Sequence, residues 1–339
     1  MPDRNVTRRC SHQPHANIGT GRRKGYVLLV VLGVIILVVT VLGLLAKVSL
    51  RRGVQAVDAQ LALQQRWGAM TMQRALLNRA PKVFEQRDEK LKELGVEGEP
   101  PPPFIRSALS LGGVTFDLML ADEDAKLNLN ALYHQGGLDQ LTRALDDVVP
   151  AAGREALRLL PAVGPMSGTQ PKASKRLSAD SARSSSRDDD QGEDPEIPPA
   201  FRSWGEVFDI AKMSASVGSD AALPNLTTGM TCWGSGQLNI RRASDASILA
   251  VVGSVIQDGG AARFLKRYRD NPASDVKVLL VTEVKNEGQR DQLAGLVAEA
   301  STNFSLWIDA SVKSGRPLRD FIVTRRDEEG VIRIEKFAH

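Results

Sequence analysis

The sequence predicts an α+β protein in which a long N-terminal transmembrane helix continues into a stalk and packs on a small antiparallel sheet. Three features indicate this fold: an uncharged apolar run near the N-terminus, apolar residues at helical spacing after it, and alternating apolar and polar residues at the C-terminal end. Between the stalk and the last strands we expect a helical insertion of reduced size, because a low-complexity segment occupies much of the middle.

The transmembrane helix is predicted at residues 26–46, YVLLVVLGVIILVVTVLGLLA, which contain no charged side chain. At 1.5 Å per residue this segment spans about 31 Å as a helix, which matches the hydrocarbon core of a bilayer. A cleaved secretory signal has a shorter apolar region and a small-residue cleavage site, whereas Lys47 and a helical sequence follow here. We therefore expect the helix to remain as an anchor.

The charges on the two sides of the anchor predict its orientation. Residues 1–25 form a leader in which six basic residues face one acid, Asp3, and fewer basic residues follow the anchor. They are Arg4, Arg8, Arg9, Arg22, Arg23 and Lys24 before it, and Lys47, Arg51 and Arg52 after it. The more basic side marks the cytoplasmic end. The chain is thus expected to cross a bacterial inner membrane once, with residues 47–339 in the periplasm.

Residues 47–94 have apolar side chains at helical spacing and are predicted to form an amphipathic stalk helix. Bends or breaks are expected near Gly53, Gly68 and Pro81. The segment GVEGEPPPP, residues 95–103, then ends the helix, because its glycines and prolines favour turns.

Residues 104–160 are predicted to form the first part of the exported α+β domain. A strand is expected within residues 107–120, with Gly112-Gly113 as the turn before its alternating part, and a helix over residues 137–149. Residues 161–199 are rich in Ser, Pro and charge and have almost no large apolar side chain. Such a segment cannot bury a core, so it is predicted to be a disordered linker.

Residues 200–339 are predicted to form the second part of the domain. Helices are expected from residue 201, over residues 245–268 and over residues 287–300, with a strand in VKVLLVTEV, residues 276–284. The chain ends in three predicted antiparallel strands, NFSLWIDASV, RDFIVTRRD and VIRIEKF, with turns at Ser314-Gly315 and Glu329-Gly330.

The exported part has few side chains suited to catalysis: His134, His339 and Cys232, without a G-x-S-x-G, H-E-x-x-H or C-x-x-C motif. We therefore expect no catalytic residue, no cofactor and no metal site, and the chain is not predicted to be an enzyme. Cys10 lies in the leader, so it cannot pair with Cys232 across the membrane. The formal net charge of +4 owes much to the leader, and no basic stripe indicates nucleic acid.

An acidic cluster in the linker is an alternative cation site. It consists of Asp188, Asp189, Asp190, Glu193 and Asp194. Calcium takes oxygen ligands, but the cluster lacks the D-x-[DN]-x-[DN]-G spacing that wraps the ion, so solvated charge is the favoured interpretation.

The segment RRKGYVLLVVLGVIILVVT, residues 22–40, resembles the leader and anchor of type IV pilin-like proteins. In that family prepilin peptidase removes a basic leader that ends in glycine. The resemblance implies cleavage between Gly25 and Tyr26, which makes Tyr26 the first residue of the mature chain. A plain signal anchor preceded by a chance Lys-Gly is the alternative.

Most pilin-like subunits have glutamate as the fifth mature residue, but this chain has Val30 there. A carboxylate inside a bilayer is costly unless it is paired, and in that family it pairs with the terminal amine of a neighbouring subunit. A subunit without it resembles the one that caps the fibre. Packing to the subunits below is then expected along the apolar residues Val30, Leu37 and Leu44.

Two segments of the exported part resemble the K-type minor pseudopilin of the type II secretion system, general secretion pathway protein K. They are LADEDAKLNLNAL, residues 120–132, and SGQLNIRRASDASIL, residues 235–249. In the second segment Arg241 and Arg242 replace the usual Asn-Thr. FRSWGEVFDI and the C-terminal strands are also similar to that family. The resemblance implies a pilin-like fold and a subunit at the tip of a secretion pseudopilus, taking part in protein secretion across the outer membrane.

By this resemblance the partners are the I- and J-type minor pseudopilins, prepilin peptidase and inner-membrane lipid. Asn128, Asn130 and Asn239 belong to the two motifs, and we expect a structural role for them: an asparagine side chain can bond nearby backbone groups where a strand ends. Ligand binding by Asn128 and Asn130 is the alternative. DNA binding through Arg241 and Arg242 is not expected, since a G-(I/V/L)-G hairpin is missing.

Two other functions remain open from the sequence. One is a membrane-anchored periplasmic binding or sensor module, and the other is a membrane-tethered hydrolase. The sequence leaves the secreted substrates open, as well as the choice between a secretion pseudopilus and a pilus, and whether the linker orders on assembly.

Overall fold

The computed structural model describes residues 21–95, 100–149, 151–165, 198–217, 222–256, 258–272, 274–312, 316–326 and 332–338. The chain forms two compact units, residues 1–60 and residues 61–339. Most of the predicted leader, most of the predicted linker with its acidic cluster, and the two turns of the C-terminal strands lie outside the described residues.

The first unit contains the start of helix α1 (Gly21–Leu77). The side chains of the predicted transmembrane segment are exposed, and α1 is the helix in the described residues that is long and apolar enough to cross a membrane. Helix α1 is continuous through Gly53 and Gly68, so the predicted breaks at these glycines are wrong. A glycine inside a helix lowers the stability of the helix by only about 1 kcal/mol relative to alanine, so the helix can continue through these positions.

The predicted break near Pro81 is present. Helix α1 ends at Leu77, and helix α2 (Ala80–Glu93) begins with Pro81 in its first turn. Proline is suited to this position because the first N–H groups of a helix have no partner within the helix.

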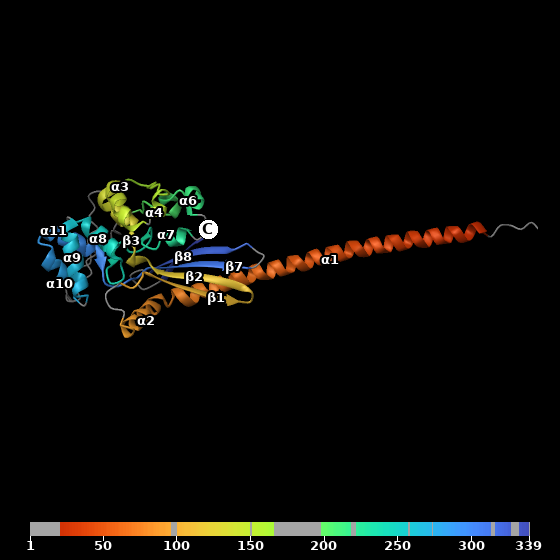
Figure 1. The fold of residues 1–339 in the computed structure, drawn as a ribbon, viewed down its shortest axis with the longest axis horizontal. Coiled ribbons are helices and arrows are strands. Elements are labelled where there is room, and N and C mark those ends of the chain that lie inside the picture. The colour runs from red at the N-terminus through yellow and green to blue at the C-terminus, as the bar shows by residue number, and fades with distance from the viewer. Residues whose placement is uncertain are drawn as a thin grey trace, which may run out of the picture. The chain divides into compact units, whose positions relative to one another are not determined.

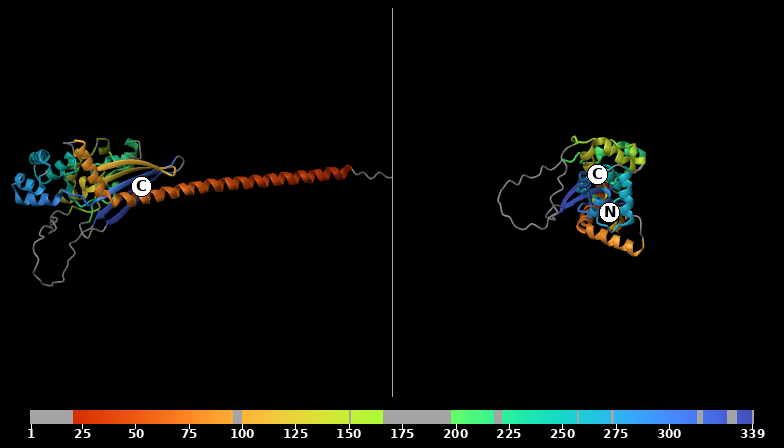
Figure 2. Two further views of the ribbon diagram at one scale, coloured as in Figure 1. Left: turned by 90° about the horizontal axis from the view of Figure 1, so that it is seen from below. Right: turned by 90° about the vertical axis from the view of Figure 1, so that its left-hand side faces the viewer.

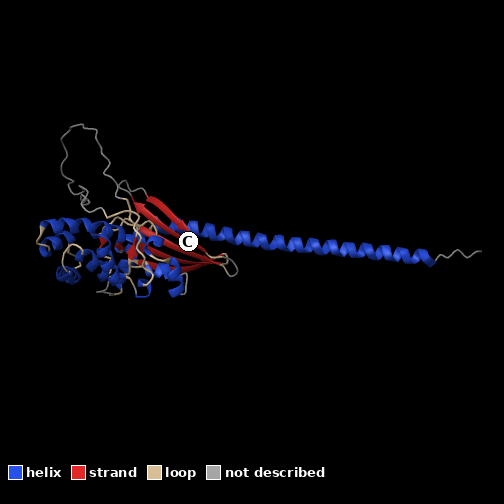
Figure 3. Ribbon diagram, turned by 90° about the horizontal axis from the view of Figure 1, so that it is seen from above, coloured by secondary structure: helices blue, strands red, loops and turns tan. Residues whose placement is uncertain are grey.

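The second unit contains a five-stranded antiparallel sheet in the order β1-β2-β7-β8-β9. Its strands are β1 (Phe104–Leu111), β2 (Val114–Asp122), β7 (Phe304–Ser311), β8 (Leu318–Arg326) and β9 (Ile332–Ala338). Figure 1 labels these elements, and Figure 3 shows the strands gathered into one layer. The α+β fold with a long N-terminal helix and a small antiparallel sheet is therefore confirmed.

Strands β1 and β2 form a hairpin whose turn is Gly112-Gly113. Both glycines have positive φ, 60° and 86°, as a two-residue hairpin turn requires. The sequence predicted only the strand after this turn. Strand β1 was missed because FIRSALSL alternates weakly between apolar and polar residues.

One face of the sheet packs on α1 and α2. Ala69 and Leu77 of α1 and Phe84 of α2 share a core with Phe116 of β2 and with apolar residues of β7 and β8. Gly68 lies so close to Phe116 that an added Cβ would be 2.2 Å from the ring Cζ. Glycine at this position therefore allows the helix to approach the sheet closely.

Strand β2 is buried differently along its length. Its first residues alternate between buried and exposed, as predicted, but residues 119–122 are all buried. The second face of the sheet is therefore covered at this end of β2. The larger of the two core clusters, which the helical part builds, begins there. This end of β2 places acidic side chains in the interior of the protein.

The helical part between β2 and β7 is extensive, so the prediction of a reduced insertion is wrong. Its helices are α3 (Leu129–Val148), α4 (Ala151–Arg154), α5 (Trp204–Val207), α6 (Ile210–Val217), α7 (Ala222–Leu226), α8 (Asp245–Gly253), α9 (Asp258–Asp270), α10 (Val276–Glu283) and α11 (Glu287–Leu296), with a one-turn helix η1 (Glu123–Ala125) before them. In Figure 1 and in the right-hand view of Figure 2, α3 and α2 lie on opposite sides of the second unit.

Three helix predictions need correction. The predicted helix at 137–149 begins earlier, at Leu129, and bends at Gly137, whose φ is 69°. The predicted helix at 245–268 is two helices, α8 and α9, and the helix predicted from residue 201 is α5 and α6. Periodicity finds such segments but not the short breaks within them.

The predicted strand VKVLLVTEV is wrong, because these residues form α10. Asp275 caps the helix by accepting a hydrogen bond from the Lys277 N–H at 2.8 Å. Val276, Leu279 and Leu280 are buried, which is the spacing of one helix face. A short run rich in valine is ambiguous between strand and helix, and here the packing against α9 and α11 decides it.

Candidate functional site: the buried polar junction

The predicted processing site and anchor residues all lie on α1. Gly25 and Tyr26 are near its start, and Val30, Leu37 and Leu44 follow at seven-residue spacing with exposed side chains. Residues seven apart differ by only about 20° around a helix, so these three form a line along it. This line is an apolar surface that lipid or another helix can cover.

The two sequence motifs meet in the second unit. Strand β3 (Leu127–Asn128) pairs with β4 (Met230–Thr231), and β5 (Leu238–Asn239) pairs with β6 (Val297–Ala298), both in parallel. These short pairs stand where the chain leaves or returns to the large sheet. They bring residues around 125 next to residues around 235 and 300.

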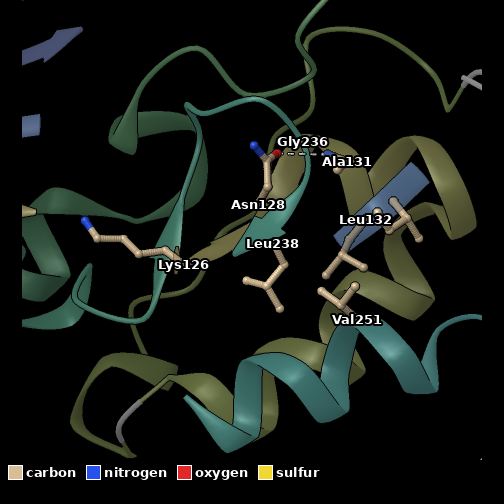
Figure 4. A pocket seen from close by; sticks show the side chains of 8 residues that line it. Lys126, Asn128, Ala131, Leu132, Gly236, Leu238 and Val251 are labelled. Carbon is tan, nitrogen blue, oxygen red and sulfur yellow. Dashed lines mark hydrogen bonds between the residues drawn. The ribbon is translucent and has the colours of Figure 1, made fainter. Parts of the chain in front are cut away.

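Asn128 caps α3 and connects it to the second motif. Its Oδ1 accepts a hydrogen bond from the Ala131 N–H at 3.0 Å (Figure 4), and its Nδ2 donates to the Trp233 carbonyl at 3.0 Å. Asn130 holds two further segments, because its Nδ2 donates to the carbonyls of Phe201 and Cys232 at 2.9 and 2.7 Å, and its Oδ1 accepts from the Phe201 N–H at 2.7 Å.

Asn239 performs the same task in the second motif. Its Oδ1 accepts from the Arg241 N–H at 3.1 Å, and its Nδ2 donates to the Ser301 hydroxyl at 2.7 Å. Ser301 in turn donates to Asp122 Oδ2 at 2.7 Å. The asparagine of one motif is therefore linked through one serine to the acidic end of β2 in the other.

Around this link lies a set of hydrogen-bonded polar residues, buried at its centre and partly exposed at its edge, that we call the polar junction. It consists of Asp88, Asp122, Glu123, Asp124, Lys126, Ser235, Asn239, Arg242, Ser301, Thr302, Asn303 and Ser305. It joins α2, the end of β2, the segment before α8 and the segment before β7.

Asp124 is the most fully bonded member of the polar junction. Its Oδ1 accepts from the N–H and hydroxyl of Ser235 at 2.8 and 3.0 Å and from Asn303 Nδ2 at 3.0 Å. Its Oδ2 accepts from the N–H and hydroxyl of Thr302 at 2.8 and 3.2 Å, and from the N–H and Nδ2 of Asn303 at 3.0 and 3.1 Å. Donors surround both oxygens, so each side of this buried carboxylate has hydrogen-bond partners.

Asp122 is also fully buried, and Arg242 is its cationic partner. Arg242 Nη1 donates to Asp122 Oδ2 at 3.1 Å, while its Nε donates to Asp88 Oδ2 on α2 at 2.8 Å. Burial raises the pKa of Asp122 from 3.8 to about 6, against the lowering effect of the Ser301 hydrogen bond, with Asp124 raising it and Arg242 lowering it. The guanidinium of Arg242 also lies 5.2 Å from the centre of the Phe84 ring.

Glu123 and Lys126 form an ion pair inside the protein. Lys126 Nζ donates to Glu123 Oε1 at 2.7 Å, and both side chains are almost completely buried. The Ser305 hydroxyl donates to the same oxygen. Removing one partner of such a pair leaves a buried charge, so both residues are needed together.

Sequence reasoning named the asparagines but missed the acids and Arg242. A signal was present: three consecutive acids, residues 122–124, directly follow the buried apolar strand. Carboxylates that directly follow a buried strand are removed from water, so they need hydrogen-bond or ion-pair partners inside the protein. The replacement of Asn-Thr by Arg241-Arg242 was another signal, because Arg242 bridges two carboxylates 120 and 154 residues away along the chain.

Two of the side chains considered for catalysis, His134 and Cys232, are held in structural contacts, and His339 lies outside the described residues. His134 Nε2 lies 3.0 Å from the Pro198 carbonyl oxygen, and Cys232 is buried, which raises the pKa of its thiol well above its ordinary value. Across the part of the chain that the structure describes, no group of three or more His, Cys, Asp or Glu residues could hold a metal ion.

A small pocket beside Asn128 has room for about one water molecule. Figure 4 shows Leu132, Leu238 and Val251 on its apolar side and the Lys126 amine directed away from them. Pockets that bind small organic ligands are much larger, about 300–1,000 Å³. The polar junction holds segments of the chain together, and the pocket beside Asn128 is far smaller than such a site.

No protein-family model and no curated protein matches the sequence. Among solved structures, the chain is similar to a chain in the crystal structure of the GspK-GspI-GspJ complex from the enterotoxigenic Escherichia coli type 2 secretion system. The sequence identity is 17%, the TM-score is 0.40, and the alignment covers 84% of this chain and 99% of that chain.

Proposed function

We propose that the chain is a K-type minor pseudopilin at the tip of a type II secretion pseudopilus. It is made as a prepilin, cleaved between Gly25 and Tyr26, held in the inner membrane by α1, and exposed to the periplasm from the stalk onward. The observation that carries the proposal is α1 itself: one unbroken helix with an exposed apolar run near its start and a buried face against an antiparallel sheet near its end.

The polar junction supports the second part of the proposal, membership in the K type. The motifs LADEDAKLNLNAL and SGQLNIRRASDASIL, which carry the resemblance, meet there through Asn239, Ser301 and Asp122. Residues that touch in this way constrain one another, so the similarity of both motifs is a similarity of one structural site. We infer that the junction fixes the helical insertion to the sheet.

Val30 supports the tip position. The fifth residue of the mature chain would be valine, so α1 has no carboxylate there to bind the terminal amine of a subunit above it. The exposed line of Val30, Leu37 and Leu44 can still pack against subunits below. We propose the I- and J-type minor pseudopilins as these subunits and assembly, rather than chemistry, as the chain's work in secretion.

Processing and partner binding test the proposal in one preparation. The full chain is co-expressed with prepilin peptidase and with I- and J-type subunits, extracted in detergent, and its N-terminus is sequenced. We expect Tyr26 as the first residue and co-purification of both partners. Gly25→Leu is expected to leave the precursor uncut, whereas Gly33→Leu, a matched change within the same helix, leaves processing intact.

Two results would contradict the proposal. An N-terminus at Met1 in the presence of active peptidase, or cleavage beyond residue 46, removes the pilin-like interpretation. Correct processing without binding of either partner removes the tip assignment. Deleting the gene in its own host then distinguishes the two fibres, since loss of protein secretion indicates a pseudopilus and loss of surface fibres indicates a pilus.

A further inference from the structure

Strand β1 lies at the edge of the large sheet and has β2 as its neighbour (Figure 1). Leu111 pairs with Val114 across the two-residue turn, so every second residue of β1, counted back from Leu111, bonds β2. The N–H and C=O groups of Arg106, Ala108 and Ser110 therefore point away from the sheet. Within the described part of the chain these groups have no hydrogen-bond partner. We call this row of backbone groups the open edge.

The open edge begins where the contact with α2 ends. Arg87 of α2 donates to the Phe104 carbonyl at 3.4 Å, which covers the start of β1. Beyond this point the side chains of Ser107, Ala108 and Ser110 are small and exposed. Small side chains leave space on both faces of β1 for those of an added strand, which would lie about 4.8 Å away.

The usual protection of an edge strand is missing from β1. Soluble proteins protect such edges with lysine, proline, bulges or very short strands. Strand β1 has eight residues, pairs with β2 without a bulge, and contains neither proline, lysine nor an acid. The opposite edge strand, β9, has three charged residues, Arg333, Glu335 and Lys336. Only one of the two edges of the sheet is thus suited to pairing with another strand.

A second copy of the chain does not fit the open edge in antiparallel pairing. Gln65 of α1 bonds the Ala310 carbonyl at one end of β7, and Phe84 of α2 stacks on Phe304 at the other end. The last turns of α1 therefore run along the strands. Two copies paired through β1 are related by a twofold axis perpendicular to the sheet, so their α1 helices point in opposite directions. Both helices could not then start from one membrane, an exclusion that rests on the proposed function.

The side chains beside the open edge indicate the chemistry of the added strand. Arg106 donates to Asn225 Oδ1 and lies 5.1 Å from the centre of the Phe104 ring, but it has no ion pair in the described residues. A carboxylate directly opposite it is favourable. On the other face Leu109 is half-buried and Leu111 is 57% exposed, which favours apolar side chains there.

We propose that the open edge binds an extended segment of a separate polypeptide as a sixth strand of the sheet. The segment has alternating side chains, with a carboxylate opposite Arg106 and apolar residues beside Leu109 and Leu111. In this mode of recognition the backbone hydrogen bonds give most of the affinity, and alternate side chains give the specificity.

A designed peptide tests the pairing. Acetyl-STVVVES-amide, aligned antiparallel to β1 with its glutamate opposite Arg106, places its central valine opposite Ala108. The probe is titrated into the full chain in detergent, with the chain labelled by ¹⁵N-alanine and ¹⁵N-serine. We expect slower amide exchange at Ala108 and Ser110, whereas Ser107, which already bonds β2, should not change.

N-methylation of the peptide separates backbone pairing from other contacts. A methyl group on the nitrogen of the central valine removes the N–H that meets the Ala108 carbonyl, so binding should weaken about 10-fold or more. The matched control carries the methyl group on the next valine, whose N–H points away from β1, and its affinity should stay that of the parent peptide. Replacing the peptide's glutamate with glutamine should weaken binding by about 2- to 5-fold.

A change in the protein makes the same test from the other side. Ala108→Pro removes an outward N–H, and proline is tolerated on an edge strand where that group faces solvent. We expect it to weaken peptide binding about 10-fold or more with little change in the unfolding temperature, while Ala108→Thr keeps the affinity. The N-methyl comparison uses the wild type, so it decides the matter even if proline disturbs β1.

The outcomes separate this inference from the proposed function. No binding at millimolar peptide, or equal affinity of the two N-methylated peptides, overturns strand addition, while processing at Gly25 and binding of the I- and J-type subunits are unaffected. A disulfide-linked dimer of Ala108→Cys in membranes overturns the choice of a separate polypeptide. Failure of processing with normal peptide binding overturns the proposed function and leaves the open edge as a peptide site.

Discussion

Replacing Arg242 with methionine removes the cation between Asp88 and Asp122 but keeps an unbranched side chain beside Phe84. Removing one partner of a buried ion pair usually costs about 3–5 kcal/mol. Asp122 keeps two hydrogen bonds, from the Ser301 hydroxyl and the Ala125 N–H, so we expect a loss of about 2–3 kcal/mol at pH 8. In a domain of this size that lowers the unfolding temperature by about 5–10 °C.

The pH dependence identifies the cause. Burial raises the pKa of Asp122 in the folded protein to about 6, above its unfolded value of 3.8, so the folded state binds the proton more tightly. The stability that this group contributes is present below about pH 4 and is lost as the pH rises through 6. Without Arg242 the folded-state pKa rises further, and the loss continues to higher pH. The deficit of Arg242→Met should therefore be large at pH 8 and small at pH 5.

The loss of stability of Arg242→Met is measured by thermal unfolding of the full chain in detergent between pH 5 and 8. Unfolding is followed by near-ultraviolet circular dichroism. Arg241→Met is the matched control, because the neighbouring side chain is 58% exposed, its partner is Glu299, and surface pairs contribute at most about 1 kcal/mol. Equal losses in the two variants, or a deficit for Arg242→Met that does not change with pH, would refute the role assigned to Arg242.

Three further changes test the packing and the polar junction by the same unfolding measurement. Gly68→Ala should lower the free energy of unfolding by about 1–3 kcal/mol, because the new Cβ meets the Phe116 ring. Gly53→Ala is the control: its Cβ has open space, so the unfolding temperature should stay equal or rise slightly. If Gly68→Ala stabilised the protein, the helix would not be held this closely to the sheet. Asp124→Asn should cost about 3 kcal/mol or more at pH 8, since an amide N–H₂ would then face the donors around it. Asp122→Asn should cost less and should flatten the pH dependence between 4 and 6, and an unchanged pH profile would assign the titration to another group.

Parts of the fold that depend on local pattern could be predicted from the sequence. The apolar run gave α1, the glycine pair gave the hairpin turn, and strict alternation gave β2, β7, β8 and β9. In the first five residues of β2, for example, buried and exposed side chains alternate, so the sequence period equals the structural period there.

The elements that were missed or wrong are those whose environment is set by distant residues. The α10 segment has apolar residues on all sides, and its valines favour a strand until α9 and α11 cover Leu279 and Leu280. Strand β1 is an edge strand that packs on one neighbour only, and its weak alternation reflects this. The size of the helical insertion was underestimated because its helices are short and separated by residues without periodicity.

The polar junction shows the same division between local and distant information. The sequence indicated that Asn128 and Asn130 bond backbone groups where a strand ends, a local rule that requires no knowledge of the partner. The acids 122–124 obey a different rule, because a buried carboxylate needs several donors, and these come from Ser235, Arg242 and residues 301–303. No spacing within the motif could identify these donors.

Because the buried carboxylates need donors from distant segments, there is a physical reason why the chain has two motifs that lie far apart in the sequence. The large sheet is interrupted between β2 and β7 by the helical part, and the return at Asn303 directly contacts the exit at Asp124. A long insertion can be tolerated at low entropic cost when its two ends are fixed together, since closure entropy grows only slowly with loop length. Asp124 and Asn303 fix those ends, and Arg242 attaches the same point to α2 through Asp88. The polar junction therefore connects the helical insertion to the sheet and to α2.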